Sequence, residues 1–263
     1  MLRLRKPSFT RQAAGVLTAI ALGLPMIVSP TWAQAPDQKT IQDAQVIFND
    51  PTPPQQGSPS GRQRGGASRG PCRQFEALTA LVPATKGVVW GQTMSDRPAF
   101  WFYLPSALTE KTPIEFVVQD ADDNYIYNTR ITAPKTKSGL IRLPIPATAK
   151  SLEVGKAYTW TLSVYCDPTK PSSSVFVKGN VQRVAGNTDL QRRLKNITPL
   201  DQASVYAANG VWYDAFDTLA VLYRETPRDR AIESAWANLL QQVNLDRLKT
   251  VPLTECCTIQ VGR

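Results

Sequence analysis

LEVGKAYTW, residues 152–160, is the stretch of sequence that decides the expected fold. A leucine stands before a glycine, and the tyrosine after it opens a long run of β-forming residues. Tyr158, Trp160 and every second residue as far as Cys166 share one face of this strand, because side chains alternate across a strand. The face is apolar or aromatic, so we expect it to point into a core, and Cys166 with it.

A leucine, a glycine turn and a tyrosine at the start of a strand are typical of the tyrosine corner of immunoglobulin-like sandwiches. The phenol there bonds back to the preceding loop, and Leu152, Gly155 and Tyr158 are predicted to form this corner. Short β-rich runs separated by turn residues surround it and indicate an antiparallel sandwich over residues 71–184. The expected strands are 75–82, 99–104, 114–119, 125–132, 140–143, 158–167 and 175–184.

Residues 185–248 have helical periodicity and are predicted to form a three-helix unit, which makes the fold class α+β. The expected helices are 201–209, 212–225 and 228–243, and residues 249–263 are expected to be a tail. The order Ala203, Tyr206, Ala215, Pro227 matches signature positions of a tetratricopeptide unit. One repeat is too short for a solenoid. The helices therefore either pack on the sandwich or on each other, or form a peptide-binding module.

Residues 1–35 have the pattern of a cleavable signal peptide. A basic segment precedes an apolar run, and small residues at Ala33 and Ala35 suit a signal peptidase. The run is shorter than the roughly 20 residues of a spanning helix, so an uncleaved anchor is the weaker alternative. No twin arginine is present, which favours the Sec route. We expect an extracytoplasmic protein of the periplasm, a thylakoid lumen or the medium, without stable membrane insertion.

Residues 36–70 are rich in Pro, Gly, Ser and Arg and are predicted to be a disordered linker, apart from a weak strand at 41–48. The formal net charge of +9 falls to +5 without the four positive charges of the expected signal. Four of these five charges correspond to Arg62, Arg64, Arg69 and Arg73. Export excludes nucleic acid as a partner, so this stretch either attracts an anionic envelope surface or only keeps the linker soluble.

Histidine is absent from the sequence, which removes the Ser-His-Asp and Cys-His arrangements. No catalytic constellation and no cofactor are expected. The four cysteines are an even set, which an oxidising compartment favours as disulfides. Cys72 precedes the first expected strand and Cys166 ends the sixth, at the same pole of a sandwich, so a bridge between them is predicted. Pairing of either with Cys256 or Cys257 stays open.

Two further groups of residues are candidate sites. Asp120, Asp122 and Asn124 match the opening of a calcium loop, but Tyr125 stands where that loop needs glycine. A plain turn is therefore expected, and no metal site is predicted. Residues 100–103 are four aromatics on one strand, whose outer pair we expect the helices to cover. The alternative is an exposed surface for sugars or peptides, and the candidate binding surface is Trp101, Tyr103, Trp212 and Tyr213.

A chain of motifs between Gly70 and about Leu245 resembles a family of exported cyanobacterial proteins named domain of unknown function 928 (DUF928). The motifs are Gly-Pro-Cys at 70–72, Leu-Thr-Ala-Leu-Val-Pro at 78–83, Asp-Arg-Pro at 96–98, Phe-Trp-Phe-Tyr at 100–103, Pro105, Gln-Asp at 119–120, residues 152–160, Cys-Asp at 166–167, Val-Phe-Val at 175–177, and Asn-Gly-Val-Trp-Tyr-Asp at 209–214. The resemblance implies an exported protein without an assigned activity, and it supplies no catalytic or binding residue.

These patterns together predict a non-catalytic binding or scaffolding protein of the cell envelope, whose partner is a protein or a glycan. The alternative is an envelope glycan- or peptidoglycan-active hydrolase that uses paired carboxylates. Its candidate carboxylates are Asp96, Glu115, Asp120 and Asp167. Two carboxylates facing each other in a deep pocket would favour the hydrolase, and a shallow groove would favour the binding protein.

Overall fold

The structure, a computed structural model, describes residues 46–53, 61–66, 71–131, 136–167, 169–170 and 172–257. The expected signal peptide at 1–35 lies outside the described residues. Residues 46–48, the described part of the weak strand expected at 41–48, are not in a strand. In the described part of the chain, no helix is both long and apolar enough to cross a membrane.

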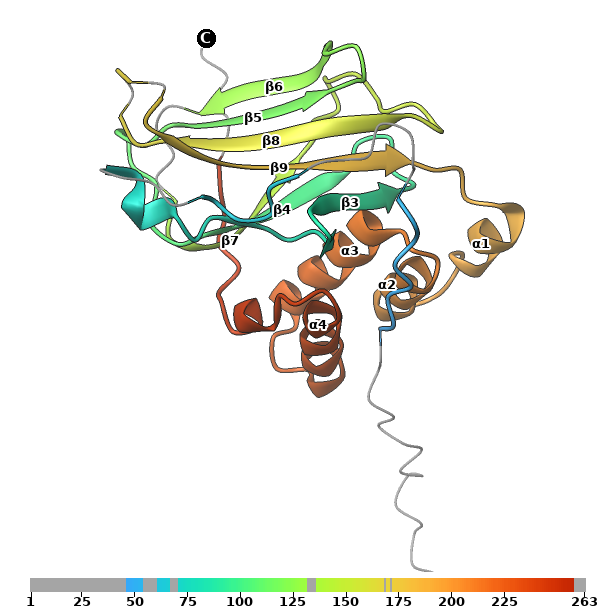
Figure 1. The fold of residues 1–263 in the computed structure, drawn as a ribbon. Helices are drawn as coiled ribbons and strands as arrows, with labels where there is room; N and C mark the ends of the chain where they lie inside the picture. Colours follow the sequence, from blue (N-terminus) through green and yellow to red (C-terminus); the bar gives the residue numbers. More distant parts are fainter. Residues whose placement is uncertain are drawn as a thin grey trace, which may run out of the picture. The chain divides into compact units, whose positions relative to one another are not determined.

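The described residues form strands first and helices afterwards, so the α+β class is confirmed (Figure 1). The strands are β1 (Thr79–Ala80), β2 (Ala84–Thr85), β3 (Val88–Thr93), β4 (Ala99–Leu104), β5 (Ile114–Gln119), β6 (Tyr125–Ile131), β7 (Gly139–Pro144), β8 (Ala157–Tyr165) and β9 (Ser174–Arg183). The helices are α1 (Thr188–Arg193), α2 (Pro199–Ala208), α3 (Trp212–Glu225) and α4 (Arg230–Gln242), with short 3-10 helices η1 (Pro71–Phe75) and η2 (Asp246–Leu248).

The strands form two sheets, with the orders β2-β3-β9-β8-β5-β6 and β1-β4-β7. Aromatic side chains fill the space between them, because each inner face presents every second residue. Phe102 on β4 meets Trp160 on β8, with ring centroids 5.6 Å apart, and Phe100 lies 5.1 Å from Phe116 on β5. All four side chains are at most 1 % exposed. The core therefore lies where the sequence predicts it.

The expectation of a purely antiparallel sandwich is wrong at one edge. Strand β3 runs parallel to β9, with Trp90 opposite Asn180. The sequence analysis missed β3 because Gly91 interrupts its β-forming residues. Glycine is needed there because α3 crosses the strand closely: a Cβ at residue 91 would lie 3.1 Å from both the Trp212 Cβ and the Tyr213 ring.

Other elements also differ from the prediction, and the two-residue strand β2 was not expected at all. The strand expected at 75–82 is reduced to β1, because η1 and the turn closed by the bond from Leu78 N–H to Phe75 O occupy its first half. The described helices number four rather than three, since α1 precedes the expected set. Asn187 caps α1 by accepting a hydrogen bond from the Leu190 N–H at 2.7 Å.

Helix α3 packs on the sandwich, along β3 and β4 (Figure 1). Its first turn enters the core: Trp212 Nε1 donates to Leu81 O at 2.9 Å, and Trp160 Nε1 donates to the Tyr213 hydroxyl at 2.7 Å. Trp101 contacts Phe216 of α3, with ring centroids 6.1 Å apart. Helix α3 thus covers Trp101 of the outer aromatic pair, as predicted, whereas Tyr103 of the same pair stays partly exposed.

The candidate binding surface is therefore wrong for three of its four residues. Trp101, Trp212 and Tyr213 are at most 3 % exposed, because α3 and the sheets bury them against one another. Tyr103 alone is partly exposed.

The expected linker at 36–70 is ordered in its described parts, which corrects the prediction of disorder there. Val46 is fully buried, and the Phe48 ring lies 4.9 Å from that of Trp212. The Gln242 side-chain amide makes two hydrogen bonds to this segment. Its oxygen accepts from the Phe48 N–H at 2.8 Å, and its nitrogen donates to Val46 O at 2.7 Å. Further on, Arg62 forms a β-bridge with Lys178 of β9. Composition predicted disorder because it does not register such contacts with distant segments.

Candidate functional site

The tyrosine corner residues lie together at the start of β8. Leu152 is fully buried, and Gly155 adopts a φ of +84° that favours glycine. The Tyr158 hydroxyl accepts a hydrogen bond from the Glu153 N–H at 2.8 Å, which is the bond back to the preceding loop that the sequence predicts. These three residues shape a turn.

The Cys72–Cys166 disulfide is confirmed. It joins η1 to the residue just after β8, with the Cα atoms 5.2 Å apart and 94 residues of separation. Cys256 is bonded to Cys257, so neither cysteine of the C-terminal pair takes part in the first bridge. The described cysteines are all oxidised and supply no thiol for catalysis.

The calcium candidate is a hydrogen-bonded turn. The Asp120 carboxylate accepts from the Asp122 N–H at 3.0 Å and from the Asn124 N–H at 2.9 Å, and the Asn124 amide donates to it at 3.1 Å. These bonds, that with the Asn124 side chain foremost, lower the pKa of Asp120. Among the described residues, no three acidic or cysteine side chains gather as a metal site would require.

The carboxylates proposed for a hydrolase do not pair with one another. Asp96 bonds to Arg97 at 2.7 Å, Glu115 accepts from the Tyr165 hydroxyl at 2.6 Å, and Asp167 accepts from Thr169 at 2.6 Å. Asp120 closes its own turn. Two other carboxylates, Asp214 and Asp217 of α3, do line one pocket of about 230 Å³. The sequence analysis did not identify them, although their spacing of three places them on one helix face.

Asp214 and Asp217 hold α3 on the sheets. Asp214 Oδ2 accepts from the Thr93 hydroxyl at 2.7 Å and from the Met94 N–H at 3.1 Å, at the end of β3. Burial raises the pKa of Asp214 to about 6. Asp217 accepts from Arg142 Nε at 2.6 Å and Nη2 at 2.8 Å, and from Trp101 Nε1 at 2.8 Å. Both oxygens of Asp217 are thus engaged, and this pocket is mainly a polar clamp between layers.

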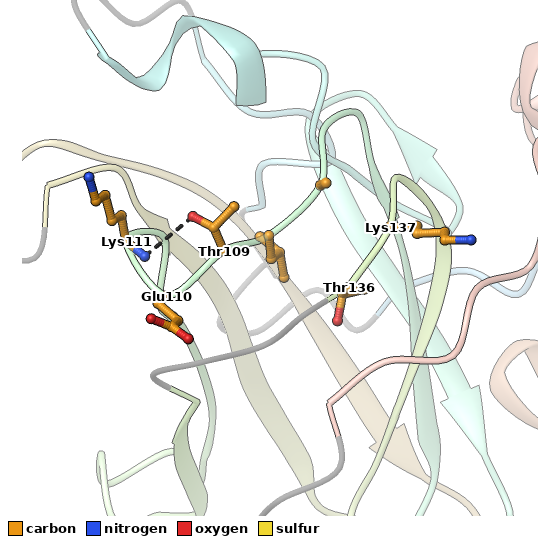
Figure 2. Close-up of a pocket in the computed structure, with 7 residues that line it drawn as sticks. Thr109, Glu110, Lys111, Thr136 and Lys137 are labelled. Atoms are coloured by element: carbon orange, nitrogen blue, oxygen red, sulfur yellow. Dashed lines mark hydrogen bonds between the residues drawn. The ribbon is translucent and has the colours of Figure 1, made fainter.

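A second hollow, of about 610 Å³, is lined by residues 107–111, 136 and 137 (Figure 2). Its walls are mostly apolar, and Leu108 forms part of the floor with only 2 % exposure. Figure 2 shows the charged ends of Glu110, Lys111 and Lys137 lying well apart from one another. The charged groups among its described lining residues do not converge on one point, so these residues supply no directing group for a ligand.

A third pocket, of about 510 Å³, brings together Arg64, Tyr103 and Arg247 from three distant segments. We call it the arginine pocket. Arg64 lies in the stretch that bridges to β1, Tyr103 on β4, and Arg247 in η2. The other described residues that line it are Gly65, Glu76, Ala77, Leu248 and Val251. Its volume falls within the range of about 300–1,000 Å³ for small-ligand sites.

Positive charge predominates among the described residues that line the arginine pocket. Burial, and then the charge of nearby Arg64, lowers the pKa of Arg247. One Arg247 nitrogen donates to the Thr79 hydroxyl at 3.1 Å, which orients the guanidinium. Within the described part of the chain, no ion pair includes Arg64 or Arg247. Glu76 is the one carboxylate among the described lining residues, and the charge of Asp246 outside the lining also acts on Arg247 and opposes the lowering of its pKa.

Sequence reasoning reached two of the three residues that define this pocket, for separate reasons. Arg64 belonged to the basic stretch, for which attraction to an anionic surface was one of two alternatives, and Tyr103 to the aromatic strand. Arg247 carried no signal, because η2 lies far from both in the sequence and nothing local marks it as a partner.

The disulfide, the two β-sheets and the C-terminal helices define the chain as a disulfide-linked α+β protein. The chain belongs to the family described as Domain of Unknown Function (DUF928), whose model matches residues 64–253. The match includes all three residues that define the arginine pocket and both cysteines of the long-range disulfide. No curated protein and no solved structure matched the chain.

Proposed function

We propose that this protein is an exported, non-catalytic binding protein of the cell envelope, and that the arginine pocket holds its ligand. The observation that carries the proposal is an open pocket lined by two exposed arginines, Arg64 and Arg247, that make no ion pair within the described residues. Guanidinium groups recognise oxyanions through paired N–H donors. A pocket that keeps two of them together has the chemistry of a receptor for an anion.

Export is supported by two features. The pattern of residues 1–35 is that of a Sec-type signal peptide. The Cys72–Cys166 disulfide is consistent with an oxidising compartment, where such bonds persist. Periplasm, thylakoid lumen and medium all satisfy both features, and a protein or glycan of the envelope is the proposed partner.

We also propose that the sandwich is immunoglobulin-like and that α2 and α3 are tetratricopeptide-like. The tyrosine corner bond of Tyr158 supports the first assignment. Ala203 of α2 and Ala215 of α3 are fully buried, as small residues at a close helix pair should be, and this supports the second.

The test is retention of the mature protein, residues 36–263, on isolated envelope fractions. An Arg64→Ala/Arg247→Ala variant should lose most of the retention. An Arg224→Ala/Arg228→Ala variant is the matched control, because it removes two exposed arginines and the same charge. Equal retention of the two variants would exclude the arginine pocket as the binding site.

A second candidate function is the hydrolase, and a specific observation favours it. Asp214, with its pKa raised to about 6, lines one pocket with Asp217, which Arg142 holds in a bidentate bond. Different environments for two neighbouring carboxylates are typical of acid–base pairs. Release of reducing sugar from envelope glycans, lost in Asp214→Asn and kept in Asp123→Asn, would establish this function in place of the first.

A further inference from the structure

We propose that the ligand of the arginine pocket is an acidic glycan, whose oxyanion binds between Arg64 and Arg247 and whose sugar ring packs on Tyr103. This inference rests on the proposed function and names the ligand class of the same site.

The charge arrangement favours an anion. Arg64 and Arg247 line one pocket, and the charge of Arg64 helps to lower the pKa of Arg247, so a negative group that contacts both would relieve their repulsion. The hydrogen bond from Arg247 to Thr79 occupies only one of its nitrogens. Arg64 is placed by its backbone, through the β-bridge to Thr79, so its guanidinium is not needed to hold the fold. A carboxylate or sulfate group that accepts from both arginines would offset their repulsion.

The remaining walls specify what carries the anion. Tyr103 is partly exposed and presents an aromatic ring with a polar end. Ala77, Leu248 and Val251 add an apolar wall. A sugar ring has an apolar face of C–H groups and a polar edge, which match these two kinds of surface. An isolated inorganic anion would leave the tyrosine and the apolar wall unused.

The size of the site and its few basic groups favour a glycan over a lipid surface. The arginine pocket is an open hollow of about 510 Å³ between β4, η2 and the segment around Arg64. A membrane surface is recognised by many basic groups spread over an exposed face, which can reach many head groups together. The described lining of this hollow includes only two, the exposed Arg64 and Arg247, which suits one acidic unit of a chain.

Isothermal titration calorimetry of the mature protein, residues 36–263, tests the proposal. Trigalacturonate carries the carboxylate, sulfated maltotriose the sulfate, and maltotriose is the neutral match. We expect at least one acidic trisaccharide to bind and maltotriose not to bind. Arg64→Ala/Arg247→Ala should weaken binding by about a hundredfold or more, because two charge-assisted hydrogen-bonding groups are lost. Tyr103→Ala should weaken it by about tenfold.

Controls separate recognition from damage to the fold. Arg224→Ala/Arg228→Ala should bind as the unmodified protein does, and Arg64→Lys/Arg247→Lys should restore part of the affinity through charge alone. Circular dichroism should give the same spectrum for all variants.

Three results would overturn the proposal: no binding of either acidic trisaccharide, equal binding by the Arg64→Ala/Arg247→Ala variant, or inorganic phosphate binding as tightly as the trisaccharides. Anionic phosphatidylglycerol vesicles that bind better than any glycan would also overturn it and identify a lipid surface instead. If glycans fail while envelope retention still depends on Arg64 and Arg247, the ligand class is wrong and the proposed function stands. If envelope retention is also independent of the two arginines, both the ligand class and the proposed function are wrong.

Discussion

Individual polar residues decide how the layers of this protein meet. Tyr158 satisfies the N–H of Glu153, and Asp217 binds both Arg142 and Trp101. Each of these groups is at least partly buried, where an unmade hydrogen bond costs about 1–3 kcal/mol. Asp214 differs, because its burial raises its pKa to about 6 while hydrogen bonds from Thr93 and Met94 oppose that rise. The hydrogen bonds of Asp214 stabilise the fold, whereas ionisation of its buried carboxyl group destabilises it.

Ionisation of Asp214 should make the free energy of unfolding fall as pH rises. Its pKa is raised from 3.8 to about 6, so between these values the folded state keeps a proton that the unfolded state has lost. Asp214→Asn stays neutral and keeps an oxygen acceptor. Its stability relative to the unmodified protein should therefore rise from pH 4 to pH 6, by up to about 3 kcal/mol, and then level off. Urea unfolding at several pH values measures this.

The exposed turn residue Asp123 supplies the matched control for that series. Asp123→Asn removes the same formal charge without touching the clamp. If both variants changed with pH to the same extent, the effect would come from net charge and not from the burial of Asp214.

At the scale of elements, local patterns predicted most of what the structure contains. Strands β4 and β5 and helix α3 match their predicted bounds, because apolar periodicity and turn residues are written in adjacent positions. The strands β2 and β3 and the helix α1 were missed. Strand β2 has only two residues and α1 only six, so neither contains a long periodic pattern. Strand β3 contains Gly91, which the close approach of α3 requires and which no local sequence window explains.

The segment at residues 46–53 should contribute to stability although its composition resembles a linker. Phe48→Ala removes a ring that packs on Trp212, and we expect a loss of about 2 kcal/mol, since the side chain is only partly buried. Ile47→Ala is the neighbouring control, because Ile47 is 56 % exposed and should change stability by less than about 0.5 kcal/mol. Chemical unfolding of both variants measures the difference. Equal losses would mean that the segment does not pack on the helices in solution.

For the whole molecule, the long-range disulfide is the main covalent restraint. Cys72→Ser/Cys166→Ser should lower the free energy of unfolding by about 4 kcal/mol, because the bridge closes a loop of 94 residues. Thermal unfolding with and without a reducing agent measures it. Reduction should bring the unmodified protein to the stability of the double variant, and Cys256→Ser/Cys257→Ser should have a much smaller effect. A double variant as stable as the unmodified protein would contradict this role.

The sequence by itself determined the α+β class, the alternating core faces of the strands and the turn before Tyr158, and it favoured the Cys72–Cys166 pairing, which the structure then selected over the alternatives. These follow from periodicity, from turn chemistry and from a small set of cysteines, all of which can be read from the chain directly. Only the tertiary structure decided that β3 lies parallel to β9, that residues 46–53 pack on the helices, and that Arg64 and Arg247 share a pocket with Tyr103. The physical reason is that packing between distant segments depends on the shapes of both partners, which no local pattern records.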